Sequence, residues 1–133
     1  MPLILDQVWN ERPGQAAFQA STSTSEAAAV VFEDDGRTGY FYACESDEGP
    51  IFDALHIYDV EEIADRDRES EFKIGWSSSG RQAALLINGH PHAVFDFELS
   101  RGWCRSGFPD PPRDGGWSTD GHAWDEDCLA SFR

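Results

Sequence analysis

The chain has 133 residues and a formal net charge of −15, from 25 acidic and 10 basic side chains. Its length fits one domain and leaves no room for two of ordinary size joined by a linker. Because 40% of the residues are hydrophobic and 13% are aromatic, we expect a folded domain rather than a disordered acidic tail. The charge argues against binding to nucleic acid or to an anionic membrane surface, and it favours a cationic partner.

The cysteines and the N-terminal residues give little sign of export. Cys44, Cys104 and Cys128 are an odd number without CxxC spacing, so we expect reduced, structural thiols rather than a disulfide framework or a zinc cluster. A secretory signal would require a Lys or Arg before its apolar run, and none precedes Asp6. No apolar run approaches the roughly 20 residues of a membrane span. These features predict a cytoplasmic protein.

In chain order, residues 1–26 are expected to form an N-terminal arm and loop, because they combine a Pro-Gly pair with a Ser/Thr run. Residues 27–106 hold short β-branched and aromatic runs separated by turn residues, which is typical of an antiparallel β core. The strands predicted within it are 28–33, 38–44, 51–58, 71–76, 81–87 and 90–99.

The connections between these strands also carry information. Asn88-Gly89 is the preferred pair for a two-residue type I′ hairpin turn. The charged stretch 59–70 is expected to be a connection with one short helical turn. Residues 107–133 should form a Pro/Gly loop followed by a Trp-rich tail that docks on the sheet, with a short helix over 125–132.

The predicted fold is mainly β, in a single domain over residues 1–133. We expect a single antiparallel, twisted, meander-like sheet of about six strands, with at most one or two short helices. Apolar residues on both faces of 38–44 and of 81–87 predict that both strands are covered on both sides.

Four histidines are the natural candidates for chemistry. His90 and His92 flank Pro91 and could chelate a metal or pair with a neighbouring acid, or they could simply complete the hairpin turn. His56 could be a general base held by Asp53 or Asp59, or a buried residue bonded to the backbone. His122 is expected to be solvated in a loop. No phosphate loop, HExxH, CxxC or Gly-x-Ser-x-Gly motif occurs, so we predict no catalytic residue, metal or cofactor.

Acidic residues concentrate between Glu45 and Glu71. This stretch holds eleven acids against two arginines, a net charge of −9. Such a run either keeps the surface soluble or binds a partner. If strand 51–58 separates the two acidic connections, the charge forms two patches; if the sheet twists enough, it forms one broad rim. The residues predicted to contact a partner are Asp47, Glu48, Glu61, Glu62, Asp65 and Asp67.

Three runs carry a family resemblance: residues 30–43, 51–58 and 83–97. They resemble a small family of acidic bacterial proteins known as a domain of unknown function, and the resemblance spans about residues 28–110. Small, acidic, single-domain proteins of this kind are similar to immunity proteins, which block polymorphic or secretion-system toxins by direct binding. The resemblance implies no catalytic residues.

We therefore expect an immunity or antitoxin-type protein that neutralises a cognate toxin. The toxin would present a basic surface and could be a nuclease. The alternative is a β-protein or enzyme that binds a small ligand or metal through His56, His90, His92 and nearby acids. A third reading is a plain interaction subunit whose charge only keeps it soluble.

Overall fold

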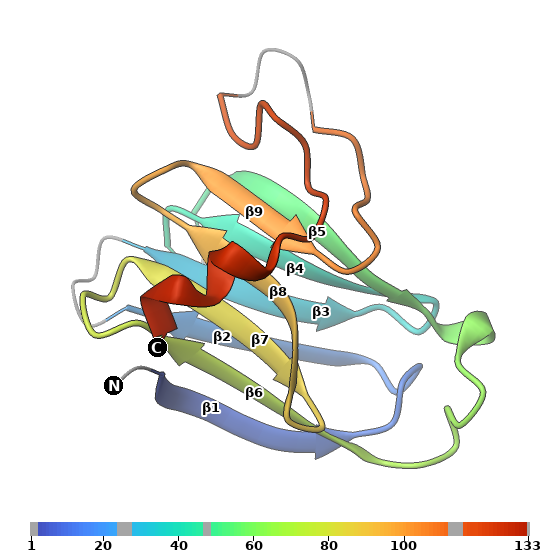
Figure 1. Ribbon diagram of the computed structural model, residues 1–133. Helices are drawn as coiled ribbons and strands as arrows, with labels where there is room; N and C mark the ends of the chain where they lie inside the picture. Colours follow the sequence, from blue (N-terminus) through green and yellow to red (C-terminus); the bar gives the residue numbers. More distant parts are fainter. Residues whose placement is uncertain (1–2, 24–27, 47–48, 112–115, 133) are drawn as a thin grey trace.

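The computed structural model describes residues 3–23, 28–46, 49–111 and 116–132. Two antiparallel sheets pack face to face, with the five-stranded sheet toward the viewer in Figure 1 and the four-stranded sheet behind it. The prediction of a mainly β protein is confirmed, but the prediction of a single sheet of about six strands is wrong. The apolar faces of two sheets cover each other, as in a β-sandwich.

The five-stranded sheet has the order β1-β6-β7-β8-β9. Its strands are β1 (Ile4–Glu11), β6 (Ser70–Trp76), β7 (Gln82–Ile87), β8 (His90–Asp96) and β9 (Arg101–Cys104). β6 to β9 follow one another as a meander, and β1 pairs with β6 at the edge. Asn88 and Gly89 join β7 to β8, and both have the positive φ angles, 52° and 81°, that a type I′ turn needs.

The four-stranded sheet has the order β2-β3-β4-β5. Its strands are β2 (Ala17–Thr22), β3 (Ala29–Asp34), β4 (Thr38–Cys44) and β5 (Ile51–Asp59). β2 lies within the segment predicted to be a loop, so that prediction is wrong. Its polar residues fit a strand because Ser21 is buried, where it accepts a hydrogen bond from Trp76 Nε1 (2.8 Å) and donates one to Asp6 (2.6 Å).

The main core lies between the two sheets. It is built from aromatic and aliphatic side chains that alternate along the strands and point inward, among them Phe32, Phe41, Leu55, Phe72 and Phe95. These five side chains are fully buried. Burying them stabilises the fold by roughly 1.5–3 kcal/mol for each side chain. The inward face of each strand is therefore committed to the core, and only the outward faces are available for other contacts.

The outward face of the five-stranded sheet is covered by the C-terminal segment. A 3-10 helix, η2 (Glu126–Phe132), lies in front of this sheet in Figure 1. Its Cys128, Leu129 and Phe132 pack with Trp124 against Ala84, Val94 and Trp103. We call the sheet surface under this segment the covered face. The C-terminal segment therefore lies on the sheet, and the expectation that β7 is covered on both sides is confirmed.

The outward face of the four-stranded sheet differs, because none of the described helices lies over it. Side chains on this face form a separate small cluster around Ala29, Val31 and Cys44, with Ala20 and Tyr42 packed against it. Phe18 and Ile51 remain 60% and 58% exposed. The prediction that β4 is covered on both sides is therefore wrong for its outward side, where Tyr40 and Tyr42 stay half-buried. We call this surface the open face.

The remaining expectations concern the connections and the thiols. A single 3-10 turn, η1 (Val60–Glu62), follows β5, as predicted. All three cysteines are free and buried, and burial raises the pKa of each thiol, for Cys128 to about 12. None of the helices in the described ranges is long and apolar enough to cross a membrane.

Candidate functional site

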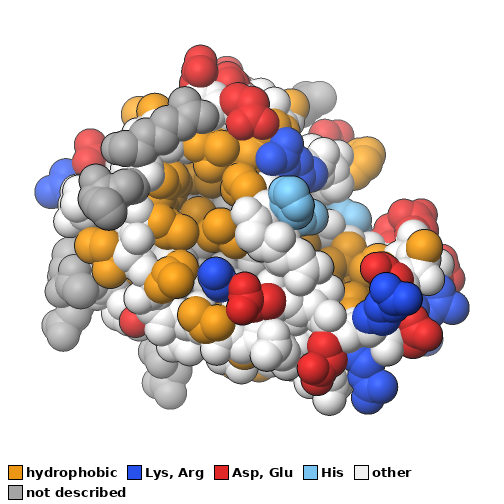
Figure 2. Space-filling view, turned by 60° about the horizontal axis from the view of Figure 1, so that its bottom comes forward, with side chains coloured by type: hydrophobic (Ala, Val, Ile, Leu, Met, Phe, Trp, Pro, Cys, Tyr) orange, Lys and Arg blue, Asp and Glu red, His pale blue; other side chains and the backbone are white. Residues whose placement is uncertain are grey.

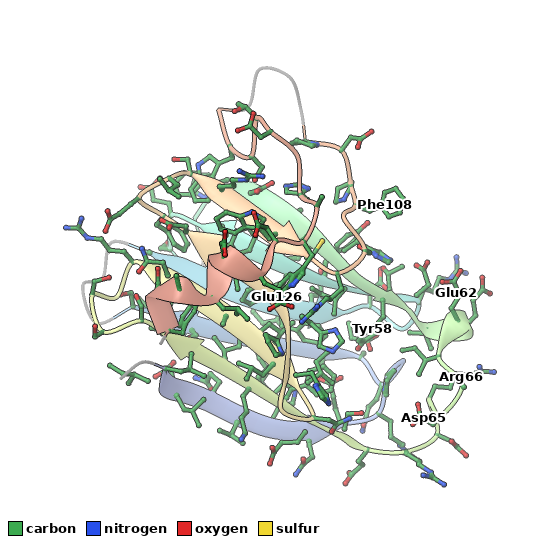
Figure 3. The ribbon with its side chains drawn as sticks, in the orientation of Figure 1. Tyr58, Glu62, Asp65, Arg66, Phe108 and Glu126 are labelled. Carbon is green, nitrogen blue, oxygen red and sulfur yellow. The ribbon has the colours of Figure 1, made fainter. Side chains whose placement is uncertain are left out.

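The predicted contact residues occupy one end of the molecule. Glu61 and Glu62 lie in η1, and Asp65 and Asp67 follow in the connection to β6; all four are exposed. Figure 3 shows Glu62, Asp65 and Arg66 together on this connection. Asp47 and Glu48 lie outside the described residues. Glu45 precedes β5 and the connection 59–70 follows it, so the acidic charge of the described residues lies at both ends of this strand rather than in one rim.

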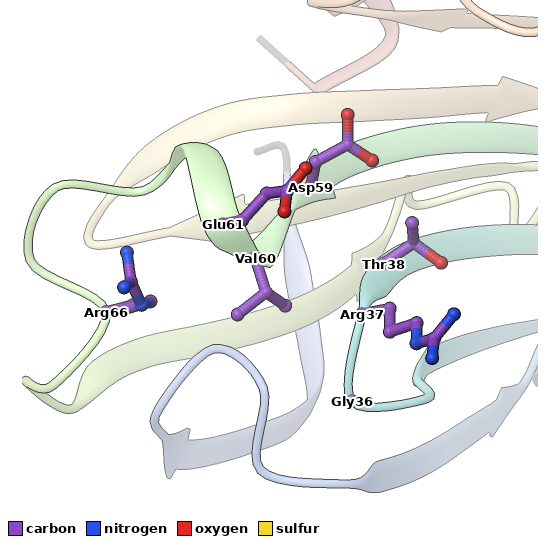
Figure 4. Close-up of a pocket in the computed structure, with 7 residues that line it drawn as sticks. All are labelled: Gly36, Arg37, Thr38, Asp59, Val60, Glu61 and Arg66. Atoms are coloured by element: carbon purple, nitrogen blue, oxygen red, sulfur yellow. The ribbon is translucent and has the colours of Figure 1, made fainter.

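The acidic connection also contains cations. Figure 2 shows acidic and basic side chains interleaved at this end of the molecule, on the right of the view. A cavity of about 560 Å³ lies here, with Asp59, Val60 and Glu61 on one side and Gly36, Arg37 and Thr38 on the other (Figure 4). Arg66 lines the same cavity and donates to the carbonyl of Ile63 (3.3 Å). Two carboxylates and two guanidinium groups therefore share this site, which gives it little net charge.

His56 belongs to a hydrogen-bond chain on β5. Its Nε2 lies 3.1 Å from Asp59 Oδ1, its Nδ1 lies 3.0 Å from Ser106 Oγ, and the ring packs edge-on against Tyr40. This order of serine, imidazole and carboxylate resembles a hydrolytic triad. However, the Ser106 hydroxyl donates its proton to the carbonyl of His56 (2.9 Å). A catalytic serine must give that proton to the imidazole, so this arrangement is not a working triad. Its hydrogen bonds instead fix the loop after β9 to β5.

His90 and His92 line a different hollow, of about 270 Å³, at the end of the sandwich near the acidic connection. Ile57, Phe72 and Ile87 form its apolar wall, and Asp65 reaches its rim. Burial, Arg105 and His90 lower the pKa of His92, which keeps its imidazole neutral near pH 7. His56 is not in this hollow, so the structure does not bring the three predicted histidines together. Across the described chain, no cluster of three metal-ligating side chains occurs.

His122, expected to be solvated, is instead only 2% exposed. Its Nε2 lies 2.9 and 3.0 Å from the two oxygens of the buried Asp53, and its Nδ1 lies 2.6 Å from the carbonyl of Pro109. Ser118 Oγ donates to the same carboxylate (2.6 Å). Burial lowers the pKa of His122, but Asp53 and the Pro109 carbonyl raise it by more, so it lies above the ordinary value. Both ring nitrogens face acceptors, which only an imidazolium satisfies.

Two further buried carboxylates, Glu11 and Asp34, lie at the ends of β1 and β3. Asp34 accepts hydrogen bonds from Gly14 N (2.7 Å), Gly36 N (2.8 Å) and the Tyr58 hydroxyl (2.6 Å), and so holds two tight turns together. Glu11 accepts from the indole of Trp9, while its Oε2 has no partner. Burial and the nearby Asp34 raise the pKa of Glu11 despite that hydrogen bond. The fully bonded Asp34 has a structural role.

The open face carries a feature that the sequence prediction missed. Tyr40 and Tyr42 lie next to each other there, with ring centres 5.9 Å apart, and Glu33 lies on the neighbouring strand. The signal was the alternation in Tyr40-Phe41-Tyr42, which correctly separates two faces but does not tell which of them is covered. Tyrosine side chains that are partly accessible at a surface are typical of surfaces that bind proteins.

Comparisons with known proteins place the chain among bacterial proteins. No solved structure matches it. A protein of Haemophilus influenzae, described as an uncharacterized protein, is 47% identical over 88 residues. That match covers 65% of this chain and 55% of the relative, so the chain spans about half the length of the protein it resembles. The family described as uncharacterized protein conserved in bacteria (DUF2251) matches residues 11–133. The chain therefore belongs to the DUF2251 family.

Proposed function

We propose that the protein binds and neutralises a basic partner protein, as an immunity protein does with its toxin. The observation that carries this proposal is the open face. There, the side chains of Phe18 and Ile51 are more than half exposed, although the equivalent face of the other sheet is covered by the chain itself. Contiguous apolar surface left in water is unfavourable, and in soluble proteins it commonly marks a binding site.

The composition of the open face fits a protein partner better than a small ligand. Aromatic residues such as Tyr40 and Tyr42 supply large contact area and lose little conformational entropy on binding. The face is formed by four neighbouring strands of one sheet. An interface with another protein typically covers about 800 Å² on each partner.

The charge of the chain selects the kind of partner. β5 borders the open face, with Glu45 before it and the acidic connection 59–70 after it. A basic surface that approaches the open face is therefore attracted from both sides. In this proposal, Asp47, Glu48, Glu61, Glu62, Asp65 and Asp67 raise the association rate, while the aromatic face sets the dissociation rate.

The direct test is co-expression with the product of the adjacent gene, which encodes the cognate toxin in systems of this kind. We expect a stable complex and rescue of growth. The association rate constant should fall by roughly tenfold or more between low and high salt, because screening weakens the attraction. If co-expression gives neither a complex nor rescue, the proposal is wrong.

Two sets of variants separate steering from contact. Neutralising Glu61, Glu62, Asp65 and Asp67 to Gln or Asn should slow association and leave dissociation nearly unchanged. Replacing Phe18 and Ile51 by Thr should speed dissociation instead. A partner that binds both variants as tightly as the unmodified protein would contradict the assignment of this face.

A second candidate function rests on the hollow that contains His90 and His92. Its apolar wall and few polar groups are typical of a site for a small ligand, although about 270 Å³ is slightly below the usual range. The test is thermal unfolding with zinc or manganese and with small carboxylates. A stabilisation that is lost in the double variant His90→Ala, His92→Ala would support this function, and no stabilisation by any of these compounds would reject it.

A further inference from the structure

The open face contains a hollow of about 220 Å³. Its walls include Phe18 from β2, Val31 and Glu33 from β3, Tyr42 from β4 and Ile51 from β5. This volume would hold roughly seven water molecules, or the side chain of one arginine. The hollow is apolar on its walls and has one carboxylate, so it suits a side chain with a long aliphatic stem and a polar end.

Glu33 is the charged group of this hollow. It pairs across the strands with Phe18 on one side and with Tyr40 on the other, so the carboxylate lies between two aromatic residues. Its described hydrogen bond is a long one, 3.4 Å from the Tyr42 hydroxyl. No Lys or Arg within the described ranges lies within ion-pair distance of it. The carboxylate is therefore half-buried, free of a cation and flanked by rings.

The negative potential of this hollow also affects Tyr42. Burial and the Glu33 carboxylate raise the pKa of Tyr42 to about 12. The raised pKa means that a negative charge on the Tyr42 oxygen is unfavourable, so the hollow disfavours anions. A cation that enters such a site gains more from a carboxylate than it would at a fully exposed position.

The C-terminal segment provides an intramolecular example of the same chemistry. The guanidinium carbon of Arg105 lies 3.9 Å from the ring centre of Trp124, and its Nη1 lies 3.5 Å from Glu126 Oε1. The indole N–H of Trp124 donates to the same carboxylate (3.1 Å). The chain thus places its own arginine against the aromatic ring and carboxylate of this segment, whereas Glu33 and the rings beside it on the open face have no arginine among the described residues.

We propose that the hollow between Phe18, Glu33 and Tyr42 receives an arginine side chain of the basic partner. The inference rests on the proposed function and names its central contact. The stem of the arginine would lie along Val31 and Ile51, and its guanidinium would stack on an aromatic ring and bind Glu33. Arginine fits better than lysine because its planar, weakly hydrated head both stacks on rings and pairs with carboxylates.

The test uses capped tripeptides, Gly-Arg-Gly, Gly-Lys-Gly and Gly-citrulline-Gly, each added to the full chain while amide shifts are followed by NMR at low salt. Citrulline keeps the shape of arginine but lacks the charge. We expect the arginine peptide to shift amides of β2, β3 and β4 around Glu33. The lysine peptide should bind several-fold more weakly, and the citrulline peptide should not bind measurably.

Glu33→Gln should weaken binding of the arginine peptide by roughly tenfold. The matched control is Glu98→Gln, an exposed carboxylate that pairs with Arg81 on the other sheet, and it should leave binding unchanged. A second variant, Ile51→Lys, changes an exposed position and should block the hollow with its own cation. The dispersion of the amide spectrum confirms that each variant is folded.

Two results would overturn this inference. The first is a set of shifts confined to the acidic connection 59–70, and the second is equal binding by Glu33→Gln and the unmodified protein. Either result leaves the proposed function intact if the adjacent gene product still forms a complex. Conversely, loss of the proposed function would not remove binding of the arginine peptide, so the two failures can be told apart.

Discussion

The outer faces of the two sheets are similar in composition, but only one of them is covered by another segment of the described chain. Each carries apolar and aromatic side chains. On the covered face, η2 brings Leu129 and Phe132 onto the sheet. On the open face, Phe18 and Ile51 stay exposed. The contrast indicates that both sheets have an apolar outer face, and that the C-terminal segment covers the part of one of them that is formed by β7, β8 and β9.

The largest expected effect comes from removing the anchor of the covering segment. His122 lies just before Trp124 and binds the buried Asp53 of β5. His122→Ala leaves that carboxylate buried without its cation, which should lower the free energy of unfolding by about 3 kcal/mol or more. Chemical denaturation measures the loss. His90→Ala is the control, because His90 is exposed, and an equal loss in both variants would contradict the assignment.

The next effect concerns the covering contact itself. Trp124→Ala removes the ring over which Arg105 stacks and part of the packing on Trp103 and Val94. We expect a loss of about 2 kcal/mol, less than for a fully buried tryptophan, since Trp124 is only half-buried. Trp124→Phe should recover most of it. Binding of a hydrophobic dye to the alanine variant would report that the covered face has become open.

A smaller effect should follow from pH. The pKa of His122 is raised in the folded state, so its contribution is fully present below the ordinary value of about 6.5 and is lost as pH rises through the folded value. The melting temperature should therefore fall as the pH rises above about 6.5, and His122→Ala should remove this slope. The pKa of His92 is lowered in the folded state, so protonation of His92 lowers stability as the pH falls below about 6.5, which is the opposite direction. If the melting temperature of His122→Ala still falls as the pH rises, the pH dependence does not come from His122.

The smallest effect on stability is expected on the open face. Phe18→Thr and Ile51→Thr should each change the free energy of unfolding by less than about 0.5 kcal/mol, because the side chains are mostly exposed and threonine favours strands. The same substitutions should weaken partner binding. Chemical denaturation and surface plasmon resonance measure the two quantities. A large loss of stability would mean that this face is covered after all.

Local sequence patterns predicted most strands of the core well. β4 begins and ends at the predicted residues, β5, β6 and β7 differ by one residue at one end, β3 differs by one residue at each end, and β8 ends three residues before the predicted end. Three strands were not among those predicted: β1, which was expected only as part of an N-terminal arm, β2 and β9. β2 is polar and short, so its pattern resembles a loop, and β9 contains Gly102 next to a bulky Trp103. Both are held by their neighbours in the sheet rather than by their own preference for extended structure.

The candidate sites were harder to predict from sequence. Asp53 and His122 are separated by 69 residues, and neither lies in a motif. The buried imidazolium arises because the loop after β9 and the C-terminal segment meet beside β5. In the same way, Glu33 and Tyr42 look like ordinary surface residues until the cross-strand register places them in one hollow. Short-range patterns carry no information about such contacts.

The sequence by itself determined the β class, most strand positions, the hairpin at Asn88-Gly89 and the concentration of charge between Glu45 and Glu71. These features depend on neighbouring residues, alternation and turn chemistry. Only the tertiary structure decided that there are two sheets, which outer face is covered, and which residues surround Glu33 and His122. The physical reason is that alternation reveals two apolar faces on a strand, whereas burial of each face depends on distant segments that compete to cover it.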